Sequence, residues 1–286
     1  MRKIIAVFFA AFLCEINAVH SQQAATQPNV LDGVYVKEHY PYRIATSFAF
    51  LREADVMWSK KVWRVMDLQE KINLPFAFPL SKQMHDRKSL IDVIMDAVEE
   101  GSVTPFKDDE FIIPVTKEEL AKVGGAGIDS TSVTEPDPPY LVHDTVIVRT
   151  FSRDKVVAYR LKEEWFFDKQ RSVMDVRIIG LAPLFYEVDE KGNKREGAKK
   201  VPVLWVYFPE IRGILANAEC FNPHNDAERR TYDDIFQKRM FSSYIIKESN
   251  VYDRRIEEYR LGMDALVESD KIKTDITNME HDMWEY

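Results

Sequence analysis

Four stretches in the second half of the chain are rich in β-branched and aromatic residues, and they constrain the fold more than any other feature. They are "DTVIVRTF" (144–151), "KVVAYRL" (155–161), "DVRIIGLAPLFYEV" (175–188) and "VPVLWVYF" (201–208). Each has a length typical of a β-strand or a little more. A charged segment, 189–200, joins the last two, and we expect them to pair across it. The sequence therefore predicts an antiparallel sheet.

Helical patterns lie on both sides of these strands. The stretch "SLIDVIMDAVEEG" (89–101) has apolar residues at helical spacing and a glycine stop at Gly101. Thr116 and Glu119 have the spacing of a capping box, and a further helix is expected to begin at Asn225 or Asp226. We therefore expect an α+β fold, in which an antiparallel sheet from the central strands is flanked by N- and C-terminal helices.

The last residues of the chain carry a heptad-like seam of apolar side chains. These residues alternate between spacings of four and three, at Ile272, Ile276, Met279, Met283 and Tyr286. Such a seam either packs a terminal helix against its own domain or joins it to another molecule. Packing within the domain is the commoner use, and intermolecular use stays open.

The stretch "READVMWSKKVWRVMDLQEKINLPFAFP" (52–79) carries two of the five tryptophans, Trp58 and Trp63. We expect a helix from about Ala49 to Asn73, because most of its apolar residues fall on one half of a helical surface. That half consists of Met57, Trp58, Val62, Val65, Met66, Leu68 and Ile72. Trp63 falls on the opposite, charged side, where a large aromatic needs a second contact surface. The surface is either another part of the chain or a different protein.

Composition divides the chain into four regions. We expect a signal peptide at residues 1–21, a helical N-terminal region at 22–123, a linker at 124–140, and a strand-rich region with C-terminal helices at 141–286. The linker, "GGAGIDSTSVTEPDPPY", is rich in glycine, proline and small polar residues.

The first residues have the features of a secretory signal. A short basic start precedes an apolar run, Ile4 to Leu13, that is too short to span a bilayer. Val19 and Ser21 are small enough for the −3 and −1 positions of a cleavage site before Gln22. Cys14 lacks the small preceding residue of a lipoprotein signal, so we interpret it as a hydrophobe within the signal. The sequence predicts a soluble, exported protein.

Charge argues against a nucleic-acid-binding protein, and cysteine content argues against a disulfide-stabilised fold. The chain has 39 Lys and Arg against 47 Asp and Glu, a net charge of −8. An acidic chain is a poor candidate for nucleic-acid binding, which depends on clustered positive charge. After signal cleavage Cys220 is the only cysteine, so no intrachain disulfide is expected and stability must come from a packed core.

Candidate catalytic residues are few. The histidines are scattered, and none forms a metal-binding pair with a nearby second ligand. Cys220 and His224 are four residues apart, and a thiol–imidazole pair can supply a nucleophile. Pro223 breaks helical alignment between them, so we interpret Cys220 as a structural small hydrophobe. We expect no catalytic, metal-binding or cofactor-binding site.

Four long blocks carry a resemblance to a known family. They are "YPYRIATSFAFLREADVMWSKKVWRVMDLQEKIN", "KEEWFFDKQRSVMDVRIIGLAPLFYEVD", "NDAERRTYDDIFQKRMFSSYIIKESNVYDRRI" and "GMDALVESDKIKTDITNMEHDMWEY". In these blocks the sequence resembles the GldN/PorN family of the gliding motility and type IX secretion machinery. The resemblance covers nearly all of the chain after residue 21.

The resemblance implies a periplasmic, non-enzymatic structural component. Such a protein is expected to associate with itself in a ring. The ring is expected to include a GldK/PorK-like outer-membrane lipoprotein, which holds the protein at the inner face of the outer membrane. It is also expected to contact a GldM/PorM-like periplasmic shaft protein. The resemblance supplies no catalytic residues.

A partner interface is the hypothesis for Trp63, Lys60 and Arg64 on the expected helix. The alternative function is a periplasmic protein that binds or hydrolyses the cell wall and uses exposed aromatic residues on glycan.

Overall fold

The computed structural model describes residues 34, 42–79, 87–116, 119, 127–134, 142–149, 153–187 and 198–284. The chain separates into two compact units, 1–41 and 42–286, and the second is described below. The predicted signal peptide and its cleavage site lie outside the described residues.

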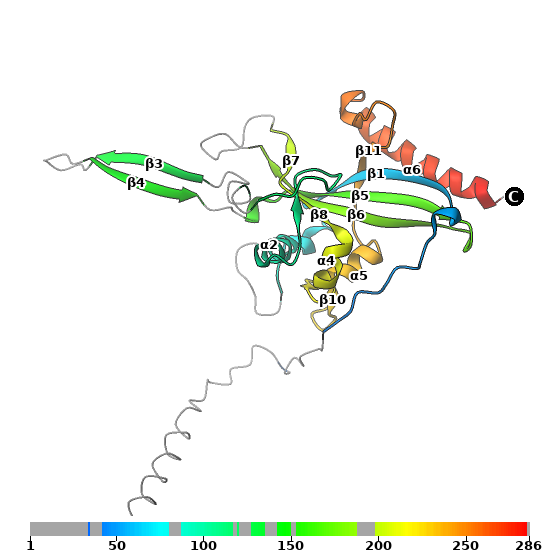
Figure 1. Cartoon of the computed structure of the whole chain (residues 1–286), viewed down its shortest axis with the longest axis horizontal. Helices are drawn as coiled ribbons and strands as arrows, with labels where there is room; N and C mark the ends of the chain where they lie inside the picture. Colours follow the sequence, from blue (N-terminus) through cyan, green and yellow to red (C-terminus); the bar gives the residue numbers. More distant parts are fainter. Residues whose placement is uncertain are drawn as a thin grey trace, which may run out of the picture. The chain divides into compact units, whose positions relative to one another are not determined.

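A seven-stranded antiparallel sheet forms the centre of the second unit (Figure 1). The strand order is β11-β1-β5-β6-β8-β2, and β7 also pairs with β6. The strands are β1 (Val56–Asp67), β2 (Pro105–Phe106), β5 (Ala158–Asp168), β6 (Val173–Tyr186), β7 (Lys200–Pro202), β8 (Trp205–Tyr207) and β11 (Tyr244–Glu248). With the helices packed on it, this sheet confirms the expected α+β class. Both strands after the charged 189–200 segment pair with β6, as predicted.

The predicted helix from Ala49 to Asn73 is wrong, because these residues contain the long strand β1. β1 pairs with β5 along one edge and with β11 along the other. Its first half alternates between partly buried and exposed residues, whereas Val62 to Met66 are all buried. A strand covered on both faces reads as a continuous apolar run, which periodicity does not distinguish from a buried helix.

Two short pairs of strands lie outside the main sheet. β3 (Gly127–Thr134) pairs with β4 (Val142–Arg149) from end to end, so part of the expected linker forms a strand. β9 (Glu219–Cys220) pairs with β10 (Arg230–Thr231). The main sheet thus draws strands from both sides of the expected linker. Short 3-10 helices occur at Glu53–Asp55, Leu74–Phe76, Arg153–Lys155 and Ile256–Glu258.

Three helices cover one face of the sheet (Figure 1). They are α2 (Leu90–Glu100), α4 (Phe208–Leu215) and α5 (Tyr232–Gln237). Their apolar residues share a buried cluster with Met66, Tyr159 and Leu161 of the sheet. The sequence predicted α2 correctly, with Ser89 accepting a hydrogen bond from the Asp92 backbone and Gly101 ending the helix at φ 77°.

Helix α5 begins later than predicted. Thr231, rather than Asn225 or Asp226, caps it in a capping box with Asp234. The Asn225 side chain instead accepts a hydrogen bond from the Ala227 backbone, as in a local turn. The predicted box of Thr116 and Glu119 is confirmed by hydrogen bonds in both directions.

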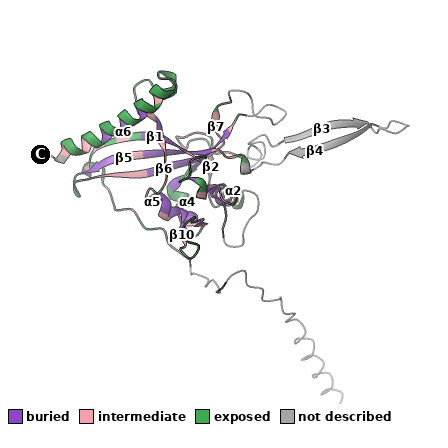
Figure 2. Ribbon diagram, turned by 180° about the vertical axis from the view of Figure 1, so that it is seen from behind, coloured by how far each residue is buried: buried purple, intermediate pink, exposed green. Residues whose placement is uncertain are grey.

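Helix α6 (Met263–Trp284) carries the predicted terminal seam. Ile272 and Ile276 are buried in a cluster with Val62 and Ile245, so the interpretation of packing within the domain holds for these two positions. The rest of α6 is largely exposed (Figure 2). Tyr286 lies outside the described residues.

The extended segment 42–50 is fastened by two arginines. Arg212 donates a hydrogen bond to the Thr46 carbonyl and stacks over Phe48, while Arg177 donates to the Ala49 carbonyl. Arg212 also forms a buried ion pair with Asp233, with 2.9 Å between Nε and Oδ1. The buried charge of Arg212 is thus paired, as its desolvation requires.

Candidate functional site

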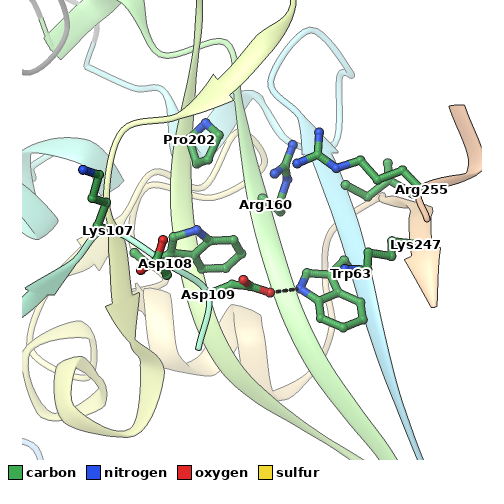
Figure 3. Close-up of a pocket in the computed structure, with 10 residues that line it drawn as sticks. Trp63, Lys107, Asp108, Asp109, Arg160, Pro202, Lys247 and Arg255 are labelled. Atoms are coloured by element: carbon green, nitrogen blue, oxygen red, sulfur yellow. Dashed lines mark hydrogen bonds between the residues drawn. The ribbon is translucent and has the colours of Figure 1, made fainter. Parts of the chain in front are cut away.

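A cavity of about 200 Å³ opens on the sheet face opposite α2, α4 and α5. Side chains alternate along a strand, so Trp63 and Arg160 face this cavity while Met66 and Leu161 face the helices. Figure 3 shows the lining residues, which come from β1, β5, β7, β8, β11 and the segments after β2 and β11. They are Trp63, Lys107, Asp108, Asp109, Arg160, Pro202, Trp205, Ile246, Lys247 and Arg255.

The segment after β2 covers one side of the cavity because β6 has a glycine beneath it. A Cβ added to Gly180 would lie 2.6 Å from Cζ of Phe111, so a side chain there would push this ring away. Phe111 packs edge-on against Phe106 and Tyr207. This contact holds the segment against the sheet and brings Asp109 to the cavity.

Trp63 is buried in this site, with 8% of its surface exposed. Its indole N–H donates to Asp109 at 2.8 Å (Figure 3), and the ammonium of Lys247 lies 4.5 Å from the ring centroid. Lys162 contacts both the ring and Asp109. Burial lowers the pKa of Lys162, although Asp109 opposes this shift. The second contact surface that Trp63 needs is therefore supplied by its own chain.

Arg160 is a buried charge without a hydrogen-bond partner or ion pair among the described residues. Only 7% of its surface is exposed, and its Nε has no hydrogen-bond partner. The pKa of Arg160 is lowered to about 10, chiefly by burial and in part by the neighbouring positive charge of Arg255. The negative charges of Glu257 and Asp109 act in the opposite direction. The two guanidinium groups approach each other at one end of the cavity (Figure 3).

Lys60 and Arg64 do not join Trp63 at this site. Side chains two residues apart on a strand share a face, so both point to the side opposite Trp63. Lys60 pairs with Glu248 at 2.7 Å, and Arg64 donates to the hydroxyl of Ser243 at 2.9 Å. Burial lowers the pKa of Arg64. The partner-interface hypothesis for the three residues stays a prediction, but they do not form one surface.

Cys220 has the environment of a packed side chain rather than a nucleophile. It is 2% exposed, and burial raises the pKa of its thiol to about 12. Thiolate, the reactive form, is therefore scarce at neutral pH. Within the residues that the structure describes, no group of three or more His, Cys, Asp or Glu is placed to hold a metal ion. The described helices also include none long and apolar enough to cross a membrane.

Sequence reasoning singled out Trp63 but missed Arg160, Arg255 and Asp109. One signal was available for Arg160, which stands as a charged residue inside the apolar run "VVAYRL". Arg255 and Asp109 lie far from it in sequence, in segments without a recognisable motif. The folded sheet alone brings them together.

Comparison with protein families gives one match, and no curated protein matches. A family model described as gliding motility associated protein GldN matches residues 51–285. The matched region includes every strand and helix of the second unit, and every residue that lines the cavity. The chain therefore belongs to the GldN family of gliding-motility-associated proteins.

Proposed function

We propose that this protein is a periplasmic structural component of the type IX secretion and gliding motility machinery. In this role it assembles with an outer-membrane lipoprotein of the GldK/PorK type into a ring and contacts a shaft protein of the GldM/PorM type. The observation that carries the proposal is the family match over residues 51–285, which spans nearly the whole second unit.

Exposed apolar side chains support a role in assembly. The segment between β11 and the first turns of α6 exposes large hydrophobic residues, including Val251 at 96%, Leu261 at 80% and Met263 at 74%. Concentrations of exposed apolar surface are typical of sites that contact other proteins. This segment is therefore suited to meet a neighbouring subunit or partner.

The proposal also states where the protein is located and that it is not an enzyme. The signal features at residues 1–21 support export, with cleavage before Gln22 and attachment to the outer membrane through the lipoprotein rather than through Cys14. The family is a structural one associated with gliding motility, and the buried, protonated thiol of Cys220 is poorly suited to nucleophilic catalysis. We therefore expect no catalytic activity.

Affinity purification from cross-linked cell envelopes tests this function. The full chain, tagged at its C-terminus and expressed in its native cells, should be recovered from the periplasm together with the lipoprotein and the shaft protein. Untagged cells provide the background. Deleting the gene should abolish export of the proteins that the type IX machinery secretes. Recovery with sedimented peptidoglycan instead of the two proteins, and normal export in the deletion strain, would support the cell-wall alternative.

Substitution of the exposed segment sharpens the test. The double change Leu261→Asp and Met263→Asp should weaken recovery of at least one partner without lowering the melting temperature, because both side chains are already in solvent. The matched control is Arg254→Gln, a change of an exposed polar residue in the same segment. Loss of recovery in the control as well would show that the effect is not specific to the two apolar side chains.

A further inference from the structure

We propose that the cavity beside Trp63 is a binding site for a carboxylate group on a short aliphatic stem, of the size of a glutamate side chain. The carboxylate would lie between the guanidinium groups of Arg160 and Arg255, and the stem against Trp63 and Trp205. This inference does not depend on the proposed place of the protein in a secretion machinery.

The first argument is that Arg160 has no partner where comparable arginines have one. Arg64 and Arg212 are buried to a similar extent, yet the first donates to Ser243 and the second pairs with Asp233. No described residue accepts a hydrogen bond from the Arg160 side chain or forms an ion pair with it. A buried, unpaired charge costs free energy of folding, so such a group is informative when it faces a cavity.

The second argument is the position of Arg255. Two neighbouring guanidinium groups repel each other, and an anion between them removes the repulsion and supplies both with hydrogen-bond acceptors. Among the described residues, none forms an ion pair with Arg255 either. Two nearby carboxylates are engaged elsewhere, since Asp109 accepts from Trp63 and contacts Lys162, and Asp253 pairs with Lys247. Glu257 acts on Arg160 through its charge alone, without an ion pair among the described residues. The charge at this end of the cavity is therefore available to a ligand.

The lining determines which anion fits. Asp108 and Asp109 also face the cavity, so a doubly charged phosphate would be repelled more strongly than a singly charged carboxylate. The planar fork of arginine matches the two oxygens of a carboxylate. A cavity of about 200 Å³ is smaller than typical pockets for drug-sized ligands, and its tryptophans offer apolar contact to methylene groups. The site thus fits a short acid, either free or on a polypeptide.

Calorimetric titration of the full chain tests the proposal with matched probes. Propionate and N-acetylglutamate N-methylamide should bind, whereas propionamide, the uncharged counterpart of propionate, should not. Inorganic phosphate should bind more weakly than propionate. Tighter binding of the glutamate derivative than of propionate would indicate a polypeptide source, and equal binding a free acid. Binding of propionamide or preferential binding of phosphate would overturn the proposal.

Three variants locate the binding. Arg160→Met and Arg255→Gln should each weaken propionate binding by about tenfold or more, as expected for loss of a charge-assisted hydrogen bond. Arg254→Gln, adjacent in sequence but outside the cavity lining, should bind as the unaltered protein does. Arg160→Met should also raise the melting temperature without ligand, because it removes the unpaired charge and keeps an apolar stem. Unchanged binding in the Arg160 and Arg255 variants would refute the assignment, as would equal losses in all three.

Discussion

Replacement of Trp63 by alanine should destabilise the isolated protein strongly. Trp63 is 8% exposed and lies between Lys247 and the Lys162–Asp109 pair. Truncating a buried tryptophan to alanine costs about 3–5 kcal/mol of unfolding free energy. A typical domain has only about 5–15 kcal/mol in total. The loss should appear in urea unfolding followed by circular dichroism, as a lower midpoint with an unchanged slope.

Two comparison variants separate the contributions to this loss. Trp63→Phe keeps a buried ring but removes the indole N–H that Asp109 accepts, and should cost about 1–3 kcal/mol, as for hydrogen bonds to charged groups. Trp58→Ala changes a tryptophan that is only partly buried at the edge of a cluster and should cost less than Trp63→Ala. If Trp63→Ala left the isolated protein as stable as before and weakened only partner capture, Trp63 would be an interface anchor and the burial argument would fail.

Further predictions concern three other buried groups. Cys220 should resist a thiol reagent at pH 8 until urea unfolds the chain, because a pKa of about 12 leaves almost no thiolate; rapid labelling of the folded protein would contradict this. The stability that depends on the protonated thiol should be intact below pH 9 and decline as the pH rises toward 12. Arg212→Met should lower the unfolding free energy by about 3–5 kcal/mol, because it leaves Asp233 buried without its partner. Lys88→Met removes one side of a half-exposed ion pair and should lower it by about 1 kcal/mol or less. Equal losses in urea unfolding would disprove the distinction. Ile272→Ala should lower the unfolding free energy by about 2–5 kcal/mol. Val267 is largely exposed on the same helix, so Val267→Ala should lower it much less. An Ile272→Ala variant as stable as the unaltered protein would show that α6 does not stabilise the domain.

Local signals in the sequence account for most of the correct predictions. Ser89 and Gly101 bound α2 through hydrogen bonds and backbone conformation that involve only a few neighbouring residues. Strands β5 and β6 have compositions that favour extended structure along most of their length. Such signals remain valid whatever the rest of the chain does.

The errors occur where distant residues decide the structure. In β1, the spacing of Trp58, Val62 and Val65 suits a helix as well as a strand, and pairing with β5 and β11 settles the choice. Those partners lie about a hundred residues or more away along the sequence, beyond the reach of any local pattern. The start of α5 was mispredicted for a smaller reason. Asn225 and Thr231 both have capping side chains and an acidic residue three positions later, but Glu228 binds Asn222 and Arg230, whereas Asp234 completes the capping box of Thr231.

Arg160 on the cavity face differs from the ion-paired buried charges on the helical face, and this difference indicates its role. On the helical face Glu163 is fully buried but receives Arg239, just as Arg212 receives Asp233. On the opposite face two features enclose Arg160. One is the segment after β2, which lies over Gly180, and the other is the edge strand β11. Pairing the buried charge would have improved stability there. The face with the cavity instead leaves the Arg160 cation unpaired, which suits it to bind an anion from outside the fold. Packing on the helical face supplies the stability that offsets the cost of this unpaired charge.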